Sequence, residues 1–178
     1  MVYATRYHSP IGELLLAEQN GALVGLWIEG QKYFLGSVDQ KFILRETPIL
    51  SQAKEWLTRY FAGDQPEIKE LQLAPLGSRF RQTVWEILCR IPYGQVSTYG
   101  EIAKEMAVRL GRDAMSAQAV GGAVGHNPIS IIIPCHRVVG SSGSLTGYAG
   151  GIATKVKLLT HEGVDLSEFF VPKRGTAL

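Results

Sequence analysis

The side chains best suited to chemistry lie next to each other late in the sequence, where a thiol is followed by an imidazole. Cys135 and His136 come directly after the isoleucines at 131–133 and Pro134. Three consecutive β-branched residues are typical of a strand buried on both faces, and Pro134 ends strand pairing because proline has no N–H to donate. A thiol at the end of a rigid strand is placed as a nucleophile should be. A small buried cysteine beside a core histidine would show the same pair, so the pair alone leaves both interpretations open.

A carboxylate that could support this imidazole follows the last predicted helix. That helix spans about residues 152–161, and Glu162 lies at its C-terminal end, next to Gly163. The helix dipole disfavours a negative charge at that end, so Glu162 needs a partner, and His136 is a candidate. A free thiol is only a few per cent ionised at neutral pH, so a nucleophilic Cys135 would need such a base.

Upstream of the thiol, two short helices with a break between them form a helix-turn-helix pattern at about residues 98–124. A capping box, Thr98 to Glu101, opens the first helix, and Asp113 can cap the second, from 114 onward. The second helix contains almost only small residues, whereas a helix that reads the DNA major groove carries several long polar side chains. Its backbone could approach a surface as narrow as the DNA minor groove. Tight packing against another helix would explain the same composition equally well.

The first half of the chain, residues 1–76, is predicted to be a small α+β unit. Three strands are expected at residues 2–8, 13–17 and 22–29, with room for an edge strand at 41–45. Asn20-Gly21 is the strongest hairpin signal available. Thr47 as N-cap and Pro48 at the first helical position start a helix that Gly63 ends. This half contains no catalytic constellation.

The second half, residues 77–178, carries the thiol, the helix-turn-helix pattern and a glycine-rich loop. Ser78 caps a helix that runs to about residue 90, and Cys89 lies close to the apolar stripe of that helix, so we interpret it as a buried, inert thiol. The loop at 140–151 lets backbone N–H groups approach a ligand. It lacks the lysine and hydroxyl residue of a phosphate-binding P-loop, so nucleotide triphosphate binding is rejected.

Composition and charge exclude several classes of protein. Of the 178 residues 46% are hydrophobic, and no apolar run approaches the roughly 20 residues of a membrane-spanning helix. Two cysteines and four histidines without metal-ligand spacing predict neither a disulfide framework nor a metal site. We expect a cytoplasmic protein with reduced thiols, no cofactor and no membrane partner. The net charge of +2 is the sum of −2 over residues 1–76 and +4 over residues 77–178, and Lys173 and Arg174 in the tail are free to meet phosphates.

Together these pieces closely resemble, over residues 80–163, the O⁶-alkylguanine-DNA alkyltransferases, also called methylated-DNA–protein-cysteine methyltransferases. The stretch Ile-Pro-Cys-His-Arg-Val-Val at 133–139 is highly specific to that family. Further matches in the same order are Ala119-Val120-Gly121-Gly122, Asn127-Pro128, Tyr148, Gly150-Gly151 and His161-Glu162-Gly163. The first half resembles the family only in its pattern, a ribonuclease H-like three-stranded sheet with a helix. The zinc of some members is not expected, because residues 1–76 contain no cysteine.

The resemblance implies direct reversal of DNA damage. A base in double-stranded DNA bound through its minor groove would be flipped out, and Cys135 would take the alkyl group from O⁶-alkylguanine or O⁴-alkylthymine. A thioether has no reasonable leaving group, so the protein would be spent after one turnover. In the family pattern His136 acts on the thiol through a water, Glu162 orients the imidazole and Asn127 shapes the turn beneath. We expect a monomer in solution, with cooperative binding on DNA left open.

The resemblance also implies a set of contacts to DNA and to the flipped base. Tyr99 would donate to the base ring and crowd the 3′ phosphate, and the N–H of Ala149 would donate to the base oxygen. The carbonyl groups of Cys135 and Val138 would accept from the guanine amino group, while Tyr148 walls the pocket. The remaining members of the set are Gln118, Ala119, Gly121, Gly122, Arg137 and Gly150.

Gln118 departs from the family pattern, because most relatives have arginine at this position, where the side chain fills the gap left by the flipped base. Glutamine can still hydrogen-bond the orphaned cytosine, but it has a shorter reach and no charge. We therefore expect the extrahelical state to be less favoured, by about 1 kcal/mol, the scale of a single hydrogen bond.

Two rival functions are open to comparison. A damage-binding protein of the alkyltransferase-like group would have the same pocket without transfer, but those relatives replace the cysteine, usually by tryptophan. A cysteine hydrolase could use Cys135, His136 and Glu162, but adjacent Cys and His side chains make a poor direct pair. Turnover separates the two enzymes, because a hydrolase cycles and an alkyltransferase stops after one equivalent. A purely structural role is the least favoured.

Overall fold

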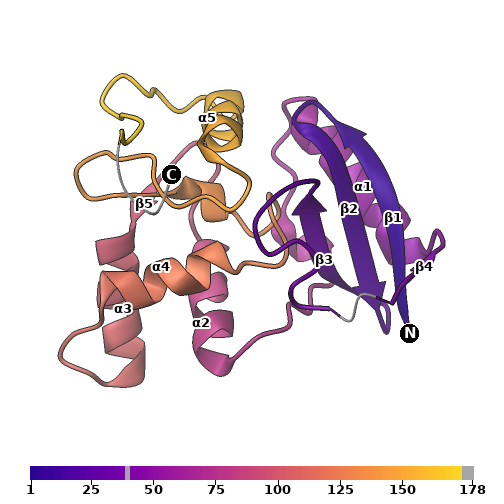
Figure 1. Cartoon of the computed structure of the whole chain (residues 1–178), viewed down its shortest axis with the longest axis horizontal. Helices are drawn as coiled ribbons and strands as arrows, with labels where there is room; N and C mark the ends of the chain where they lie inside the picture. Colours follow the sequence, from indigo (N-terminus) through magenta and orange to yellow (C-terminus); the bar gives the residue numbers. More distant parts are fainter. Residues whose placement is uncertain (39–40, 174–178) are drawn as a thin grey trace. The chain divides into compact units, whose positions relative to one another are not determined.

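Strand-forming residues at the N-terminus build a four-stranded sheet in the computed structural model, which describes residues 1–38 and 41–173. In the order β3-β2-β1-β4, the strands are β1 (Val2–Ser9), β2 (Gly12–Gln19), β3 (Ala22–Ile28) and β4 (Ile43–Leu44) (Figure 1). The first three pair antiparallel, and β4 pairs parallel with β1. Asn20 and Gly21 both have positive φ, as a type I′ turn requires, so the predicted hairpin is confirmed. The sheet therefore has the three predicted strands and the short edge strand for which the sequence left room.

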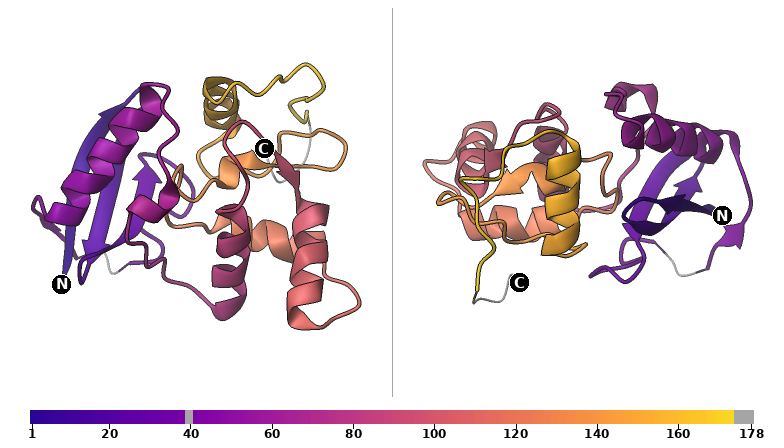
Figure 2. Two further views of the ribbon diagram at one scale, coloured as in Figure 1. Left: turned by 180° about the vertical axis from the view of Figure 1, so that it is seen from behind. Right: turned by 90° about the horizontal axis from the view of Figure 1, so that it is seen from above.

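Helix α1 (Pro48–Phe61) begins where the sequence predicted. The side chain of Thr47 accepts a hydrogen bond from the N–H of Leu50, and Pro48 opens the first turn. The apolar stripe of α1, which includes the buried Trp56, packs on one face of the sheet (Figure 2). The 3₁₀ helix η1 (Ile68–Glu70) follows. The helix thus supplies the second layer of the predicted α+β unit.

The chain divides into two units. Unit 1 contains Met1–Gly77 and Pro128–Ile132, and unit 2 contains Ser78–Asn127 and the chain from Ile133 onward. Residues 128–132, which we expected in the second half, belong to unit 1 because they hydrogen-bond to β3. The N–H of Leu26 donates to the carbonyl of Pro128 at 2.8 Å, and the N–H of Ser130 donates to the carbonyl of Leu26 at 2.9 Å.

Within residues 128–134, all of which the structure describes, the predicted buried strand before Cys135 does not form. Ile129 makes one isolated bridge with Leu26, and the chain then turns. Ile131 has a φ of +70°, which is unusual for a β-branched residue, and the N–H of Ile132 donates to the carbonyl of Ser130. Ile131 and Ile132 are each 1% exposed. The apolar run therefore indicated burial correctly, but the prediction of extended backbone was wrong.

Unit 2 contains the helices α2 (Arg79–Leu88), α3 (Tyr99–Leu110), α4 (Ala117–Gly125) and α5 (Ile152–His161). The predicted caps of the first two are confirmed: Ser78 caps α2, and Thr98 and Glu101 form the capping box of α3. The last helix also has the predicted bounds. α4 begins three residues later than predicted, because the hydroxyl of Ser116, and not the carboxylate of Asp113, accepts from the N–H groups of its first turn.

A small sheet connects the start of α3 with the segment after Cys135. β5 (Ser97–Thr98) pairs parallel with β6 (Val138–Val139). The 3₁₀ helix η2 (Cys135–Arg137) directly precedes β6. Because Tyr99 follows β5 and Arg137 precedes β6, this pairing brings the start of α3 close to the turn that holds the thiol.

The segment after α5 lies along the glycine-rich loop. The N–H of Phe170 donates to the carbonyl of Gly143 at 3.0 Å, and the N–H of Leu145 donates to the carbonyl of Phe170 at 2.9 Å. Lys173 is exposed, and Arg174, expected beside it as a phosphate contact, lies outside the described residues. In the part of the chain that the structure describes, every helix is too short or too polar to cross a lipid bilayer.

Candidate active site

Cys135 is held in the turn of η2 by contacts that begin at Asn127. The side-chain amide of Asn127 donates to the carbonyl of Ile133 at 2.8 Å, and the N–H of Cys135 donates to the same carbonyl at 2.8 Å. Asn127 also hydrogen-bonds to the thiol. Asn127 and Cys135 are only 4% and 5% exposed. The sulfur is thus presented by a tight turn rather than by the end of a strand, and Asn127 contacts both the turn and the sulfur.

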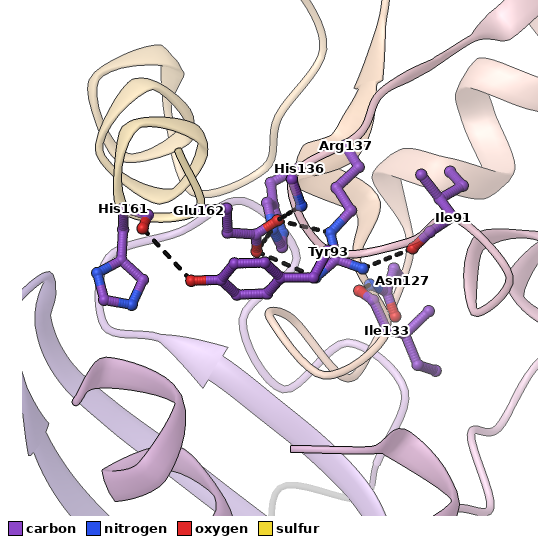
Figure 3. Close-up of polar contacts among 9 residues, drawn as sticks. Ile91, Tyr93, Asn127, Ile133, His136, Arg137, His161 and Glu162 are labelled. Carbon is purple, nitrogen blue, oxygen red and sulfur yellow. Dashed lines mark hydrogen bonds and ion pairs between the residues drawn. The ribbon is translucent and has the colours of Figure 1, made fainter. Parts of the chain in front are cut away.

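His136 contacts the carboxylate that the helix-dipole argument selected. Nε2 of His136 lies 2.6 Å from Oε2 of Glu162, and both side chains are fully buried (Figure 3). Glu162 is the C-cap residue of α5, where the dipole alone would disfavour it. An ionised carboxylate only accepts, so Nε2 carries the proton and Nδ1 keeps a lone pair. Among the described residues, Nδ1 has no hydrogen-bond partner.

Arg137 neutralises Glu162 from the other side. Its Nε donates to Oε1 at 2.7 Å and its Nη2 donates to Oε2 at 3.1 Å. Its Nη1 donates to the carbonyl of Ile91 at 2.6 Å, and its guanidinium lies 5.7 Å from the ring centroid of Tyr93 (Figure 3). The resemblance had implied a DNA contact for Arg137. The structure instead makes it a buried partner of Glu162, 7% exposed, because the planar guanidinium can pair with both carboxylate oxygens.

The protonation states at this cluster follow from burial and pairing. Burial would raise the pKa of Glu162, but hydrogen bonds from His136 and Arg137 and the charge of Arg137 outweigh it and hold that pKa well below its usual range. Burial lowers the pKa of His136, although Glu162 acts in the opposite direction, so the imidazole is neutral. A neutral imidazole with an available Nδ1, oriented by a carboxylate, can act as a general base.

Opposing effects act on the pKa of the Cys135 thiol. Burial raises its pKa. A hydrogen bond from Asn127, the charge of Lys155 and the backbone N–H groups of Cys135 and His136 all lower it, but the net result stays above the ordinary value. Removal of the thiol proton therefore needs a base, and once formed the thiolate has several donors around it.

Tyr99 links the start of α3 to the glycine-rich loop. Its hydroxyl donates to the carbonyl of Thr146 at 3.1 Å. Gly147 has a φ of +85°, and a Cβ at that position would lie 2.4 Å from Oη of Tyr99. Burial, and then the negative charge of Cys135, raise the pKa of Tyr99, so its hydroxyl remains protonated. The next residue, Tyr148, is buried, with its ring centroid 6.5 Å from that of His136.

Lys155 is the residue of this region that the sequence did not single out. Its side chain is fully buried, and Nζ donates to the carbonyl groups of Val138 and Thr146. Burial lowers its pKa to about 8. One signal was available: Lys155 lies on the same helical face as Leu158 and Leu159, three and four residues on, so its position predicts burial despite its charge.

The residues expected to contact DNA divide into an open helical face and a partly covered loop. On α4, Gln118, Ala119 and Gly122 are exposed, whereas Val138 is buried and Ala149 and Gly150 are partly buried. In the described part of the chain, a Cβ at Gly122 or Gly125 would meet no atom within 4 Å, and one at Gly121 would only touch the ring of Tyr99. These glycines therefore leave a smooth open surface, so tight helix packing does not explain Gly122 and Gly125.

Family models and relatives match this chain over most of its length. The model described as the DNA binding domain of 6-O-methylguanine DNA methyltransferase matches residues 79–164, and that of its ribonuclease-like domain matches residues 1–75. A methylated-DNA–protein-cysteine methyltransferase of Haemophilus influenzae is 37% identical over 92% of this chain and 87% of that protein. One of Methanosarcina barkeri is 42% identical over 93% and 99%. The solved structure of Mycobacterium tuberculosis OGT in complex with DNA is 40% identical, covers 94% of each chain and has a TM-score of 0.78.

These similarities extend over both halves of the chain. The ribonuclease-like model over residues 1–75 agrees with the sheet and helix predicted there, and the likeness to the solved structure confirms the mixed α+β class. Relatives of this identity and coverage also bear out the resemblance carried by the residues around Cys135. The chain belongs to the methylated-DNA–protein-cysteine methyltransferase family.

Proposed function

We propose that the protein repairs alkylated DNA by moving the alkyl group of O⁶-alkylguanine, and of O⁴-alkylthymine, to Sγ of Cys135, once per molecule. The observation that carries this proposal is the sequence of contacts around the thiol: a neutral His136 with an available Nδ1, oriented by an ionised Glu162. Nucleophile, base and orienting carboxylate are the groups that such a transfer requires. The named activity of the relatives supports the assignment.

The transfer itself is a displacement at carbon. A bridging water passes the proton of Cys135 to Nδ1 of His136, and Glu162 stabilises the imidazolium that forms. The bond between Sγ and the alkyl carbon forms as the bond between that carbon and the base oxygen breaks, and the electron pair of the broken bond moves to the base. Because the resulting thioether has no good leaving group, Cys135 is not regenerated and the protein acts once.

The charge that develops on the base needs hydrogen-bond donors. The N–H of Ala149 can donate to the base oxygen, and the protonated hydroxyl of Tyr99 can donate to the ring. Val138 presents its carbonyl beside η2 and can accept from the guanine amino group. A purine reaches Sγ only after the residues that cover the sulfur move, because Cys135 is 5% exposed. We propose that Tyr99 then exchanges its hydrogen bond to Thr146 for one to the base.

Double-stranded DNA is bound through α4. Its exposed face is lined by Gln118, Ala119 and Gly122, and side chains this small allow the helix backbone to approach the minor groove closely. Gln118 is placed to fill the gap left by the flipped base. The protein acts as a monomer, one molecule on each lesion. The relative from Mycobacterium tuberculosis, solved in complex with DNA, supports a DNA partner.

Intact-protein mass measurement tests the transfer directly. The protein is mixed with an oligonucleotide that contains O⁶-methylguanine, with Cys135→Ser and Cys89→Ser as matched variants. The parent protein and Cys89→Ser should each gain the mass of one methylene group and then stop, and Cys135→Ser should gain none. A gain that follows Cys89, or repair that continues far beyond one equivalent as in a hydrolase, would overturn the proposal.

A further inference from the structure

Lys155 is a buried charge that the proposed reaction leaves unused. It lies in the first turn of α5, where the positive end of the helix dipole disfavours a cation, and its side chain is fully buried. Removing an ammonium group from water is costly unless hydrogen bonds and an opposite charge compensate. A lysine in this place therefore needs an anionic neighbour in the unit.

The hydrogen bonds of Lys155 all go to backbone carbonyls next to the site. Nζ donates to the carbonyl of Val138 and, at 2.8 Å, to that of Thr146. The carbonyl of Thr146 also accepts from the hydroxyl of Tyr99 at 3.1 Å. Lys155 thus ties together β6, the glycine-rich loop and, through the shared carbonyl, the start of α3.

The ammonium lies beside the turn that holds the thiol, because Nζ donates to the carbonyl of Val138, and the N–H of Val138 donates to the carbonyl of Cys135. The charge of Lys155 favours the thiolate of Cys135, and the charge of Cys135 in turn favours the ammonium of Lys155. The other titratable groups packed around the sulfur bring no net charge: Tyr99 is held protonated and His136 is neutral. In a buried site, the attraction between opposite charges is much stronger than in water.

We infer that Lys155 is a positioning residue for alkyl transfer, whose ammonium is the buried counter-ion of the Cys135 thiolate and holds the Thr146 carbonyl and the glycine-rich loop in place. This inference rests on the proposed function. It assigns the formation of the thiolate to two separate contributions: His136 removes the proton, and Lys155 stabilises the anion that remains.

Titration of the thiol by its ultraviolet thiolate absorbance tests the inference without DNA. In a Cys89→Ala background Cys135 is the only thiol, and a reference protein with Cys89→Ala and Cys135→Ala subtracts the absorbance of the ionising tyrosines. Lys155→Met keeps the length of the side chain and removes its charge, and it should raise the proton affinity of the Cys135 thiolate at least about tenfold. Lys157→Met is the matched control, because Lys157 is exposed on the same helix and its loss should leave the titration unchanged.

The single-turnover transfer rate supplies the second readout. At neutral pH Lys155→Met should transfer methyl groups about tenfold more slowly than the parent, and the difference should shrink as the pH is raised and the thiolate is restored. A merely structural role would lower the rate by the same factor at every pH. If the parent protein transfers no methyl group, the proposed function fails, whereas the thiol titration still decides the role of Lys155.

Lys155→Arg keeps the inference testable if Lys155→Met does not fold. The guanidinium preserves the charge, so the thiol of Lys155→Arg should titrate within about threefold of the parent even where the transfer rate is reduced. Coincident thiol titrations of the parent and Lys155→Met would overturn the inference. The inference would also be overturned if Lys155→Arg raised the proton affinity of the Cys135 thiolate tenfold over that of the parent.

Discussion

Cys89 and Cys135 both lie in unit 2 and both have a raised pKa, but only the surroundings of Cys135 offer hydrogen-bond donors to a thiolate. Cys89 is the C-cap residue of α2 and is partly exposed; burial, and then the charge of Glu86, raise the pKa of its thiol to about 11. Cys135 is the more deeply buried of the two, yet Asn127, Lys155 and two backbone N–H groups all favour its thiolate. If Cys135 is the reactive thiol, as we propose, exposure does not select it; the donors and charges that can stabilise the anion do.

Two histidine–glutamate pairs also differ because of their surroundings. His8 contacts Glu13 on β1 and β2, but the side chains are 85% and 41% exposed, so water screens the pair. His136 and Glu162 are both fully buried, and Arg137 balances the carboxylate. The same two residue types thus form a surface contact in unit 1 and a buried, oriented pair in unit 2.

Removal of the Glu162 charge should have the largest effect on the reactivity of Cys135 relative to that of Cys89. Glu162→Gln leaves Arg137 buried without its counter-ion, so we expect a loss of about 3 kcal/mol in the free energy of unfolding. The imidazole of His136 loses its orienting anion, so the rate of methyl transfer to Cys135 should fall about a hundredfold. Chemical denaturation and single-turnover kinetics measure the two effects, and Glu168→Gln, at an exposed position, is the control.

The pH dependence of stability provides a further check on Glu162. Its pKa in the folded protein lies below the ordinary value of 4.5, so the unfolded chain binds more protons in acid. Its stabilising contribution is therefore fully present above pH 4.5 and is lost as the pH falls below that value. Glu162→Gln should show a shallower acid loss than the parent, and identical acid profiles would contradict the buried ion pair.

Asn127→Ala should have a smaller effect, which is a weaker stabilisation of the Cys135 thiolate with no change at Cys89. It removes a hydrogen bond to the thiolate, and bonds to charged groups contribute about 1.5–3 kcal/mol, so the proton affinity of the Cys135 thiolate should rise about tenfold. Cys89 should titrate as before. Separate titrations in Cys89→Ala and Cys135→Ala backgrounds measure the two thiols, and an equal shift in both would indicate a global change instead of a local one.

Local signals predicted much of this arrangement. Three features could be predicted from a few neighbouring residues each: the turn at Asn20-Gly21, the capping box at Thr98 and the pairing of Glu162 with His136. The first two follow from the residue types that a tight turn and a helix N-terminus require. The third follows because a carboxylate at a helix C-terminus requires a partner. The family pattern around Cys135 predicted the family, which the relatives confirm, and the role of the thiol stays a proposal.

The features that the sequence did not predict have a common physical cause, because each depends on contacts between residues that are distant in sequence. An apolar run reports burial but not backbone dihedrals, so Ile131 was predicted in a strand and lies in a turn. The family resemblance implied a DNA contact for Arg137, but Glu162, 25 residues on, accepts its hydrogen bonds. Lys155 pairs with backbone carbonyls, which carry no sequence signal.

Gln118→Arg should change repair without changing either thiol. An arginine on the open face of α4 adds a charge and a longer reach toward the gap left by the base, so duplex affinity and repair rate should each rise about fivefold, equivalent to about 1 kcal/mol. Binding isotherms and single-turnover kinetics on duplex DNA measure the gain. Gln118→Met, of similar length but uncharged, is the control. An unchanged duplex affinity and rate would remove Gln118 from the flipping step.

Glu86→Gln should have the smallest effect, because it acts on the unreactive thiol. Glu86 favours protonated Cys89, but its side chain is 71% exposed, so water screens most of its charge. The reactivity of Cys89 toward a small alkylating reagent should therefore rise by less than about twofold, and that of Cys135 should stay unchanged. Burial is the larger cause of the raised pKa, and the substitution leaves it in place. If Glu86→Gln instead made Cys89 as reactive as Cys135, one surface charge would account for the inertness of Cys89, and the donors around Cys135 would lose their explanatory role.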